Sequence, residues 1–388
     1  MPHFPIRSVG RLRRLFMPLA AVLALAACDA GPTGEAPPVS RGAVSVALLV
    51  PLDSSDLRTR AVAASLENAA RLAISDLNGV RVDLQVYRTD GTPGRAAEAA
   101  RAAAAAGADV LLGPLFADAA RAAGAAVAGD GIQVLAFSNN PEAAGGNVFL
   151  LGTSFRNTAE RLVGYAAMQG RNRILVVHER TRSGEVGRDA AQAAIARAGA
   201  TLTGIVGHEF TQDGVVAVTS EAVETARASQ TNAVLFTADA AGALPLLSQL
   251  LPEAGLRAPE VQFLGLTRWD IPSQTLTLPG VQGGWFTLPD PELAAAFAAR
   301  YAAGYGTAPH SLAALAYDGI AAIAALAAQD GAVSAAALTQ PAGFAGANGA
   351  FRFHPDGTST RALAVATIEN SQVVVLDPAP RRFDAAGL

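Results

Sequence analysis

Short apolar runs rich in β-branched residues alternate along the chain with longer segments in which apolar residues recur at helical spacing. In the first part of the chain, the short runs predict strands at residues 44–50, 82–87, 109–113 and 132–136. The segments between them predict helices at residues 57–77, 93–106 and 117–128. Strands that alternate with helices, without a hairpin signal, predict a parallel, doubly wound α/β sheet.

The same alternation then restarts, which predicts a second lobe of similar size. Strands are expected at residues 173–178, 233–236 and 262–264, and helices at residues 159–168, 185–198 and 241–251. Two more helices follow at residues 291–305 and 311–328. The chain then predicts antiparallel strands at residues 350–353, 361–368 and 373–376, the last two joined by a turn at Asn370-Ser371.

This pattern predicts one two-lobed domain over residues 43–377, with its lobes joined by several strands. We expect the first lobe to comprise about 43–151 and 288–340, and the second about 152–287 and 341–377. Residues 378–388 form a tail.

The N-terminus has the layout of an export signal. Four arginines at positions 7, 11, 13 and 14 precede an apolar run over residues 15–27, which is too short for a membrane-spanning helix of ~20 residues. Leu25-Ala26-Ala27-Cys28 resembles the lipobox of bacterial lipoproteins, which implies a signal peptide over 1–27, acylation of Cys28 and a lipidated tether over 28–42. Ordinary signal cleavage, with Cys28 an incidental thiol, is the alternative.

Charge and motif content exclude several classes of function. The formal net charge is −4, and removal of the four signal arginines makes it −8, whereas nucleic-acid binding needs a basic surface. No two of the five histidines have metal-ligand spacing, and neither a nucleophile elbow nor a phosphate-binding glycine motif is present. We therefore expect no catalytic residues, no metal, no cofactor and no nucleic-acid partner.

A set of motifs in fixed order resembles a known family. They are VALLVPL (46–52), VYRTDGT (86–92), DVLLGPLFADAA (109–120), IQVLAFSNNP (132–141), RILVVHER (173–180), LAALAYDGIAA (312–322) and GANGAFRFHPDG (346–357). Together they resemble the type I periplasmic binding proteins of the branched-chain amino-acid branch. The resemblance implies two doubly wound lobes, a multi-strand hinge, and a small ligand bound between the lobes at the carboxyl ends of the strands.

Within that fold, the chain looks similar to the lipoprotein activators of penicillin-binding proteins (the LpoA-like family). The tyrosine before the TDG motif, the unbroken GPL at 113–115 and the lipobox are the features that carry this likeness. It implies a class A penicillin-binding protein as partner and an outer-membrane anchor, although Asp29 after the lipidated position leaves the inner membrane open.

Two positions implied by the resemblance lack the groups that hold an amino acid. The hydroxyl that binds the ligand carboxylate is replaced by Ala117, and the carboxylate that binds the ammonium is replaced by Thr267. Asp239 or Asp270 are the possible substitutes. A buried ammonium without a counterion is costly, so a free amino acid is a doubtful ligand.

Other candidate contacts with a small polar ligand lie at expected strand ends. Ser138, Asn139 and Asn140 follow one strand of the first lobe, although SNNP is also a typical turn. Arg180 and Ser183 follow the first strand of the second lobe and could meet an anionic group, with a solvated loop as the alternative. Phe116, before Ala117, completes the set.

The leading hypothesis from the sequence is a non-enzymatic periplasmic lipoprotein that binds and activates a peptidoglycan synthase. The alternative is a lipid-anchored solute-binding receptor of an ABC importer, with an amino acid, amide or short peptide as ligand.

Overall fold

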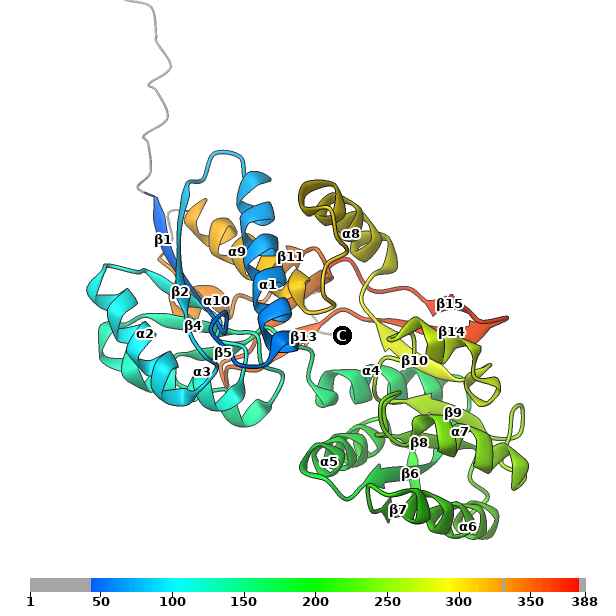
Figure 1. Cartoon of the computed structure of the whole chain (residues 1–388). Helices are drawn as coiled ribbons and strands as arrows, with labels where there is room; N and C mark the ends of the chain where they lie inside the picture. Colours follow the sequence, from blue (N-terminus) through cyan, green and yellow to red (C-terminus); the bar gives the residue numbers. More distant parts are fainter. Residues whose placement is uncertain (1–42, 330–331, 384–388) are drawn as a thin grey trace, which may run out of the picture. The chain divides into compact units, whose positions relative to one another are not determined.

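The protein is described from a computed structural model, which covers residues 43–329 and 332–383. The predicted signal peptide, Cys28 and the tether at 28–42 lie outside the described residues. The described chain contains two separate sheets with helices on both faces, so the predicted α/β fold with two lobes is confirmed (Figure 1).

The first lobe is built on five parallel strands in the order β2-β1-β3-β4-β5. These strands are β1 (Val44–Val50), β2 (Val82–Arg88), β3 (Val110–Leu112), β4 (Gln133–Ala136) and β5 (Val148–Leu150). The helices of this lobe are α1 (Leu57–Ser75), α2 (Pro93–Ala105), α3 (Ala117–Ala126), α8 (Pro291–Tyr305), α9 (Ala313–Ala327) and α10 (Ala335–Leu338).

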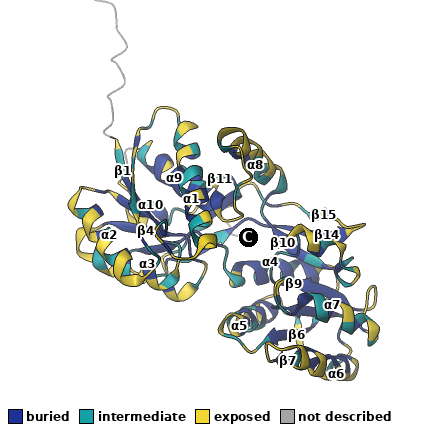
Figure 2. Cartoon of the chain, viewed as in Figure 1, coloured by how far each residue is buried: buried dark blue, intermediate teal, exposed yellow. Residues whose placement is uncertain are grey.

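The strand β1 explains why the apolar run at its position is continuous. Val46, Leu48 and Val50 pack into the core beneath α1 and α9, whereas Ala47 and Leu49 pack into the core beneath α2 and α3. A parallel strand covered on both faces needs apolar residues at successive positions. Figure 2 shows central strands such as β4 and β9 in dark blue and the exposed positions mainly on the helices.

The second lobe is built on seven strands in the order β15-β14-β10-β9-β8-β6-β7, which are parallel except that β14 runs antiparallel to its two neighbours, β10 and β15. The strands are β6 (Arg173–Glu179), β7 (Thr201–His208), β8 (Ala233–Phe236), β9 (Gln262–Gly265), β10 (Trp285–Leu288), β14 (Ala364–Glu369) and β15 (Gln372–Asp377). The helices are α4 (Phe155–Met168), α5 (Arg182–Arg197), α6 (Gln212–Ala228) and α7 (Leu244–Glu253).

A third sheet, which is antiparallel, joins the lobes. Its position shows that part of the predicted division of the chain into two lobes was wrong. It contains β11 (Phe344–Gly346), β12 (Gly349–Phe353) and β13 (Ser359–Arg361). Residues 341–353 were expected in the second lobe, but Phe344, Phe351 and Phe353 are buried in the core of the first lobe. The single strand expected at 361–368 is instead two strands in two sheets, β13 and β14.

Several elements were not predicted because they are short or lie at a sheet edge, among them β11 with three residues and α10 with four. β5 has only three residues, β7 lies at a sheet edge with its first residues exposed, and β10 has only four residues. The helix α6 was also not predicted. The turn at Asn370-Ser371 is confirmed, since both residues have positive φ (52° and 60°), as a tight two-residue hairpin turn requires.

None of the helices in the described residues combines the length and the apolar character that a membrane crossing requires.

Candidate functional site

A cavity of about 750 Å³ lies between the two lobes at the carboxyl ends of their strands. We call it the cleft. The first lobe contributes the start of α1, the loops after β3 and β4, and the start of α9, whereas the second lobe contributes the loop after β9. The residues of the cleft with polar side chains are Arg58, Thr59, Ser138, Asn139, Asn140, Thr153, Thr158, Thr267, Arg268, Thr287, Ser311 and Asn348.

The start of α1 places a cation at the cleft. Asp56 caps the helix by accepting hydrogen bonds from the backbone N–H groups of Arg58 and Thr59, at 3.3 and 2.9 Å. Hydrogen bonds from the hydroxyl and the N–H of Thr59 lower the pKa of Asp56, so the cap is ionised. The guanidinium of Arg58 is exposed and makes no hydrogen bond or ion pair with any described residue. Arg58 is therefore the free cationic group of the cleft.

The loop after β3 supplies an apolar wall. Phe116 is 43% exposed, and its ring lies over Gly91 of the TDG motif. A Cβ atom at Gly91 would lie 2.8 Å from a ring carbon, and the φ of +94° at this position also favours glycine. The next residue, Ala117, begins α3 and lines the cleft without a hydroxyl.

The loop after β4 is both a turn and part of the cleft. The Oγ atom of Ser138 accepts the N–H of Asn140 at 3.1 Å, and the Oδ1 atom of Asn140 accepts the N–H of Glu142 at the start of the 3₁₀ helix η2 (Pro141–Ala143). The turn interpretation of SNNP is thus correct. Ser138, Asn139 and Asn140 nevertheless all line the cleft, and the hydroxyl hydrogen of Ser138 remains available to donate.

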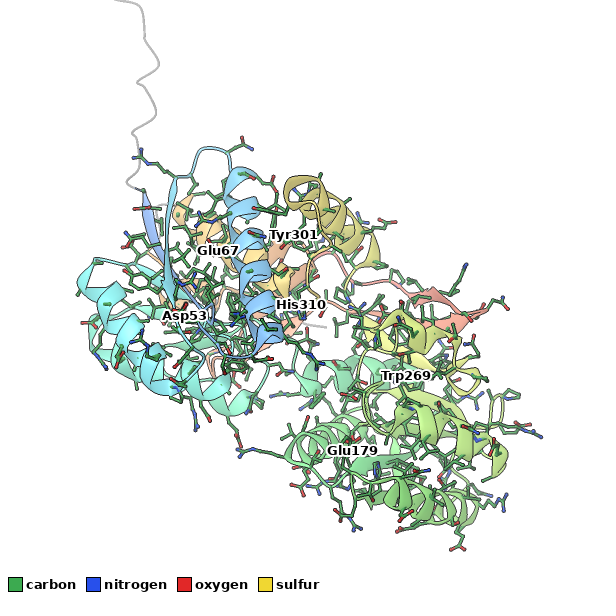
Figure 3. The ribbon with its side chains drawn as sticks, viewed as in Figure 1. Asp53, Glu67, Glu179, Trp269, Tyr301 and His310 are labelled. Carbon is green, nitrogen blue, oxygen red and sulfur yellow. The ribbon has the colours of Figure 1, made fainter. Side chains whose placement is uncertain are left out.

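The loop after β9 is held by a buried tryptophan. Trp269 is fully buried inside the second lobe (Figure 3), stacked on Phe286 with ring centroids 6.3 Å apart. Gly265 and Gly284 make room for the indole, since a Cβ atom at either would lie within 2.4 Å of it. Trp269 is therefore a core residue, and it fixes the preceding Thr267 and Arg268 at the cleft.

The two carboxylates that were the possible substitutes at the ammonium position are already engaged. Asp270 binds the guanidinium of Arg268, with a Nε–Oδ1 distance of 2.7 Å. Asp239 accepts the N–H groups of Ala241 and Gly242 at 3.0 and 2.7 Å, and it does not line the cleft. Thr267 lines the cleft, but its hydroxyl donates to the carbonyl of Ala238 at 3.1 Å.

The structure separates two further candidates from the cleft. Arg180 is exposed and pairs with Glu209 at 3.3 Å. Ser183 lines a different cavity, on the far side of the Asn139–Asn140 turn. Six candidates therefore meet at the cleft, namely Phe116, Ala117, Ser138, Asn139, Asn140 and Thr267.

The groups at helix starts were not predicted from the sequence. Arg58 and Thr59 are the clearest examples, because a helix that follows a parallel strand begins at the carboxyl edge of the sheet. The Asp56 cap next to a predicted helix start was the signal that could have located them. Ser311 and Asn348 carry no comparable signal.

The chemistry of the cleft follows from this lining. No aspartate or glutamate lines it within the described residues, and it holds two arginines, of which Arg268 is already paired. Aromatic and aliphatic side chains from both lobes face the polar groups, among them Phe137, Phe155 and Ile271. The cleft therefore suits a small ligand with one anionic group and an apolar body. Across residues 43–329 and 332–383, no three His, Cys, Asp or Glu side chains gather as a metal site.

Comparisons with known proteins agree with this geometry. Residues 43–372 match the family described as periplasmic binding protein. A search of curated proteins finds no match to the sequence.

Solved structures share the fold at low identity. One from Rhodospirillum rubrum, assigned to a branched-chain amino acid ABC transporter, has a TM-score of 0.72 at 19% identity and covers 86% of this chain and 100% of its own. A substrate-binding protein from Desulfitobacterium hafniense in complex with Leu has a TM-score of 0.64 at 17% identity and covers 86% of this chain and 100% of its own. A solute-binding protein from Rhodopseudomonas palustris in complex with 3,4-dihydroxybenzoic acid has a TM-score of 0.61 at 15% identity. It covers 88% of this chain and 98% of its own.

Proposed function

The chain belongs to the periplasmic-binding-protein family, and we propose that it is a solute-binding receptor of an ABC importer for a small carboxylate without an ammonium group. The family places it in the periplasm. The observation that carries the proposal is the cleft lining, which has a free Arg58 and no carboxylate among the described residues.

The charge of the cleft favours an anion and disfavours a zwitterion. A ligand carboxylate would gain a charge-assisted hydrogen bond from Arg58, and hydroxyl donors such as Ser138 lie on the same lobe. An α-ammonium would find no acidic partner, because Asp270 is paired with Arg268 and Asp239 lies outside the cleft. Burial of an unpaired charge costs several kcal/mol, of the order that separates ligands from non-ligands.

The apolar walls favour an aromatic or branched aliphatic body on this carboxylate. Phe116, Phe137 and Phe155 contribute three aromatic rings, and the volume of about 750 Å³ is within the range for small-molecule sites. Among proteins of this fold, one binds leucine and another binds 3,4-dihydroxybenzoic acid. The second ligand has the charge that we propose for this cleft.

A thermal-shift screen of the folded domain tests this function. The panel contains benzoate, 4-methylpentanoate, leucine, 4-methylpentanamide and a dipeptide. A ligand at 100 times its dissociation constant stabilises the folded state by ~2.7 kcal/mol. We expect shifts with the carboxylates and none with leucine, the amide or the dipeptide. If only leucine or the dipeptide raises the unfolding temperature, the ligand class that we propose is wrong.

Activation of a peptidoglycan synthase is the second candidate function. Its support is that Ala117 and Thr267, which lack the groups expected to hold an amino acid, both line the cleft, together with the lipid expected at Cys28. A pull-down from detergent extract, with the acylated protein as bait, distinguishes the two functions. Recovery of a class A penicillin-binding protein would support the activator, and recovery of a transporter permease would support the receptor.

A further inference from the structure

A second cavity, of about 860 Å³, adjoins the cleft. We call it the rear cavity. Asn139, Asn140 and Phe155 line both cavities, so the turn after β4 and the start of α4 form the wall between them. The other walls of the rear cavity come from α5 of the second lobe and from the hairpin of β12 and β13.

We propose that the rear cavity is a second binding site, which takes a ligand bearing carboxylate groups and is separate from the cleft. The proposal does not rest on the ligand of the cleft. It rests on the charge balance of the rear cavity and on an arginine there that has no acidic partner among the described residues.

The arginines of the rear cavity carry more positive charge than the carboxylates available to them can balance. Arg156 and Arg197 share one carboxylate, that of Glu160, with a distance of 2.9 Å from the Nε atom of Arg156. Arg182 pairs with Glu142 across the two lobes, from the start of α5 to η2. The remaining acid of the cavity, Asp189, is bound by Arg188, which lies outside it.

Arg352 has no acidic partner among the described residues. Its guanidinium carbon lies 4.7 Å from the ring centroid of Phe383, and its Nε atom is buried without a hydrogen bond. Phe383 thus fixes the arginine through a cation–π contact and leaves its hydrogen-bond donors unused. A half-buried guanidinium in this state is ready to receive an anion.

The strand pairing places Arg352 on the face of the hairpin that lines the rear cavity. Arg352 is paired in register with Thr360, and both residues line the cavity. Because side chains alternate along a strand, the side chain of Ser359, which pairs with Phe353, lies on the opposite face. The hydroxyl of Thr360 is engaged by the Nε2 atom of His354 at 2.7 Å. Arg352 is therefore the free group that this hairpin presents to a ligand.

The cavity is larger than a single small ion needs, and its free charge occurs at two places, Arg352 and the Arg156–Glu160–Arg197 group. These two places favour a ligand with more than one carboxylate. Citrate is a suitable probe because it combines three carboxylates with a hydroxyl group. Isothermal titration calorimetry at low ionic strength measures its affinity and stoichiometry.

The expected result is binding of one citrate per chain, weakened at least tenfold by Arg352→Gln and several-fold by Arg197→Gln, which removes one of the two cations that share Glu160. Two variants are expected to stay within twofold of the unaltered protein. Arg101→Gln removes the same charge from an exposed position on α2 that lines neither cavity, and Arg58→Gln removes the free cation of the cleft. Should Arg352→Gln not fold, as judged by circular dichroism, Arg197→Gln remains as the test.

Three results would overturn the proposal. They are no citrate binding, equal weakening by Arg101→Gln and Arg352→Gln, and binding that depends on Arg58 but not on Arg352 or Arg197. The last result would place citrate in the cleft. Failure of the cleft to bind benzoate or 4-methylpentanoate would leave the proposal for the rear cavity unaffected, so the two failures are distinguishable.

Discussion

Asp318 and Arg361 form an ion pair of 2.7 Å that is almost completely shielded from water. The side chains are 0% and 3% exposed. The pair connects α9 of the first lobe to β13 of the joining sheet. Arg361 also donates to the carbonyl of Leu151, and Asp318 accepts the N–H of Ala347 at 2.7 Å. Burial raises the pKa of Asp318, although the charge of Arg361 opposes this effect. The strands that connect the lobes are therefore tied to the first lobe by one buried charge pair.

Loss of one partner of this pair should destabilise the protein strongly. In Asp318→Asn the carboxamide has nearly the same size, but the guanidinium of Arg361 is left buried without a counterion. We expect a loss of ~3–5 kcal/mol in the free energy of unfolding, measured by urea denaturation. The control Glu98→Gln breaks an exposed pair with Arg95 and should leave stability nearly unchanged. Equal effects of the two substitutions would contradict the structural role of the pair.

The stability of the protein should fall as the solution becomes acidic, in part because of His178. This side chain is 6% exposed, and burial lowers its pKa below the ordinary value of 6.5, although a hydrogen bond to the carbonyl of Glu179 acts in the opposite direction. Nearby Arg188 and His208 lower the pKa further, and Glu185 raises it. Since the unfolded chain then binds more protons than the folded chain, the stability present above pH ~6.5 is lost as the pH falls.

Urea denaturation at about pH 7.5 and about pH 5.5 measures this dependence. We expect His178→Gln to show a smaller loss between the two conditions than the unaltered protein. The dependence should not vanish, because burial also lowers the pKa of His354. An identical loss in both proteins would exclude His178 as a source.

Cys28 provides a simple test of membrane anchoring. It is the only cysteine of the chain, so acylation would leave the mature protein without a free thiol. We expect the unaltered protein to sediment with membranes and to resist maleimide labelling, and Cys28→Ser to be released from the membrane fraction. A soluble mature protein with a reactive thiol would instead support ordinary signal cleavage.

Arg58 should contribute directly to ligand affinity. If it binds the ligand carboxylate, Arg58→Gln should weaken benzoate binding about tenfold, or ~1.4 kcal/mol. The matched control is again Arg101→Gln, which should bind benzoate normally. Fluorescence or calorimetric titration gives both affinities. Unchanged affinity in Arg58→Gln would show that another group holds the carboxylate.

The sequence predicts the parts of the fold whose residues are buried on both faces. β1 at Val44–Val50 and β8 at Ala233–Phe236 were predicted with the bounds that the structure has, because continuous apolar runs mark central strands. β7 was not predicted, since an edge strand packs on fewer neighbours, and this one contains Gly204 and the exposed Thr201. Residues 341–353 were assigned to the wrong lobe, because local pattern does not specify which core a strand enters.

The sequence predicts which loops reach the candidate site, but it does not show the local partners of their side chains. Ser138 and Asn139 reach the cleft because strand order alone brings their loop to the carboxyl edge of the sheet. Asp239 and Arg180 also follow strands, but their side chains turn to local partners that a sequence does not show. The same limit applies to Asp270, whose pairing with Arg268 decides that the cleft has no free acid.

The most direct test of the proposed ligand class is a calorimetric comparison of 4-methylpentanoate with leucine. The two molecules differ only in the ammonium group, so the ratio of their affinities measures what that group costs in the cleft. We predict that 4-methylpentanoate binds at least tenfold more tightly than leucine, with one site per chain. Tighter binding of leucine would contradict the account, because it would require a negative partner in a cleft that has none among its described residues.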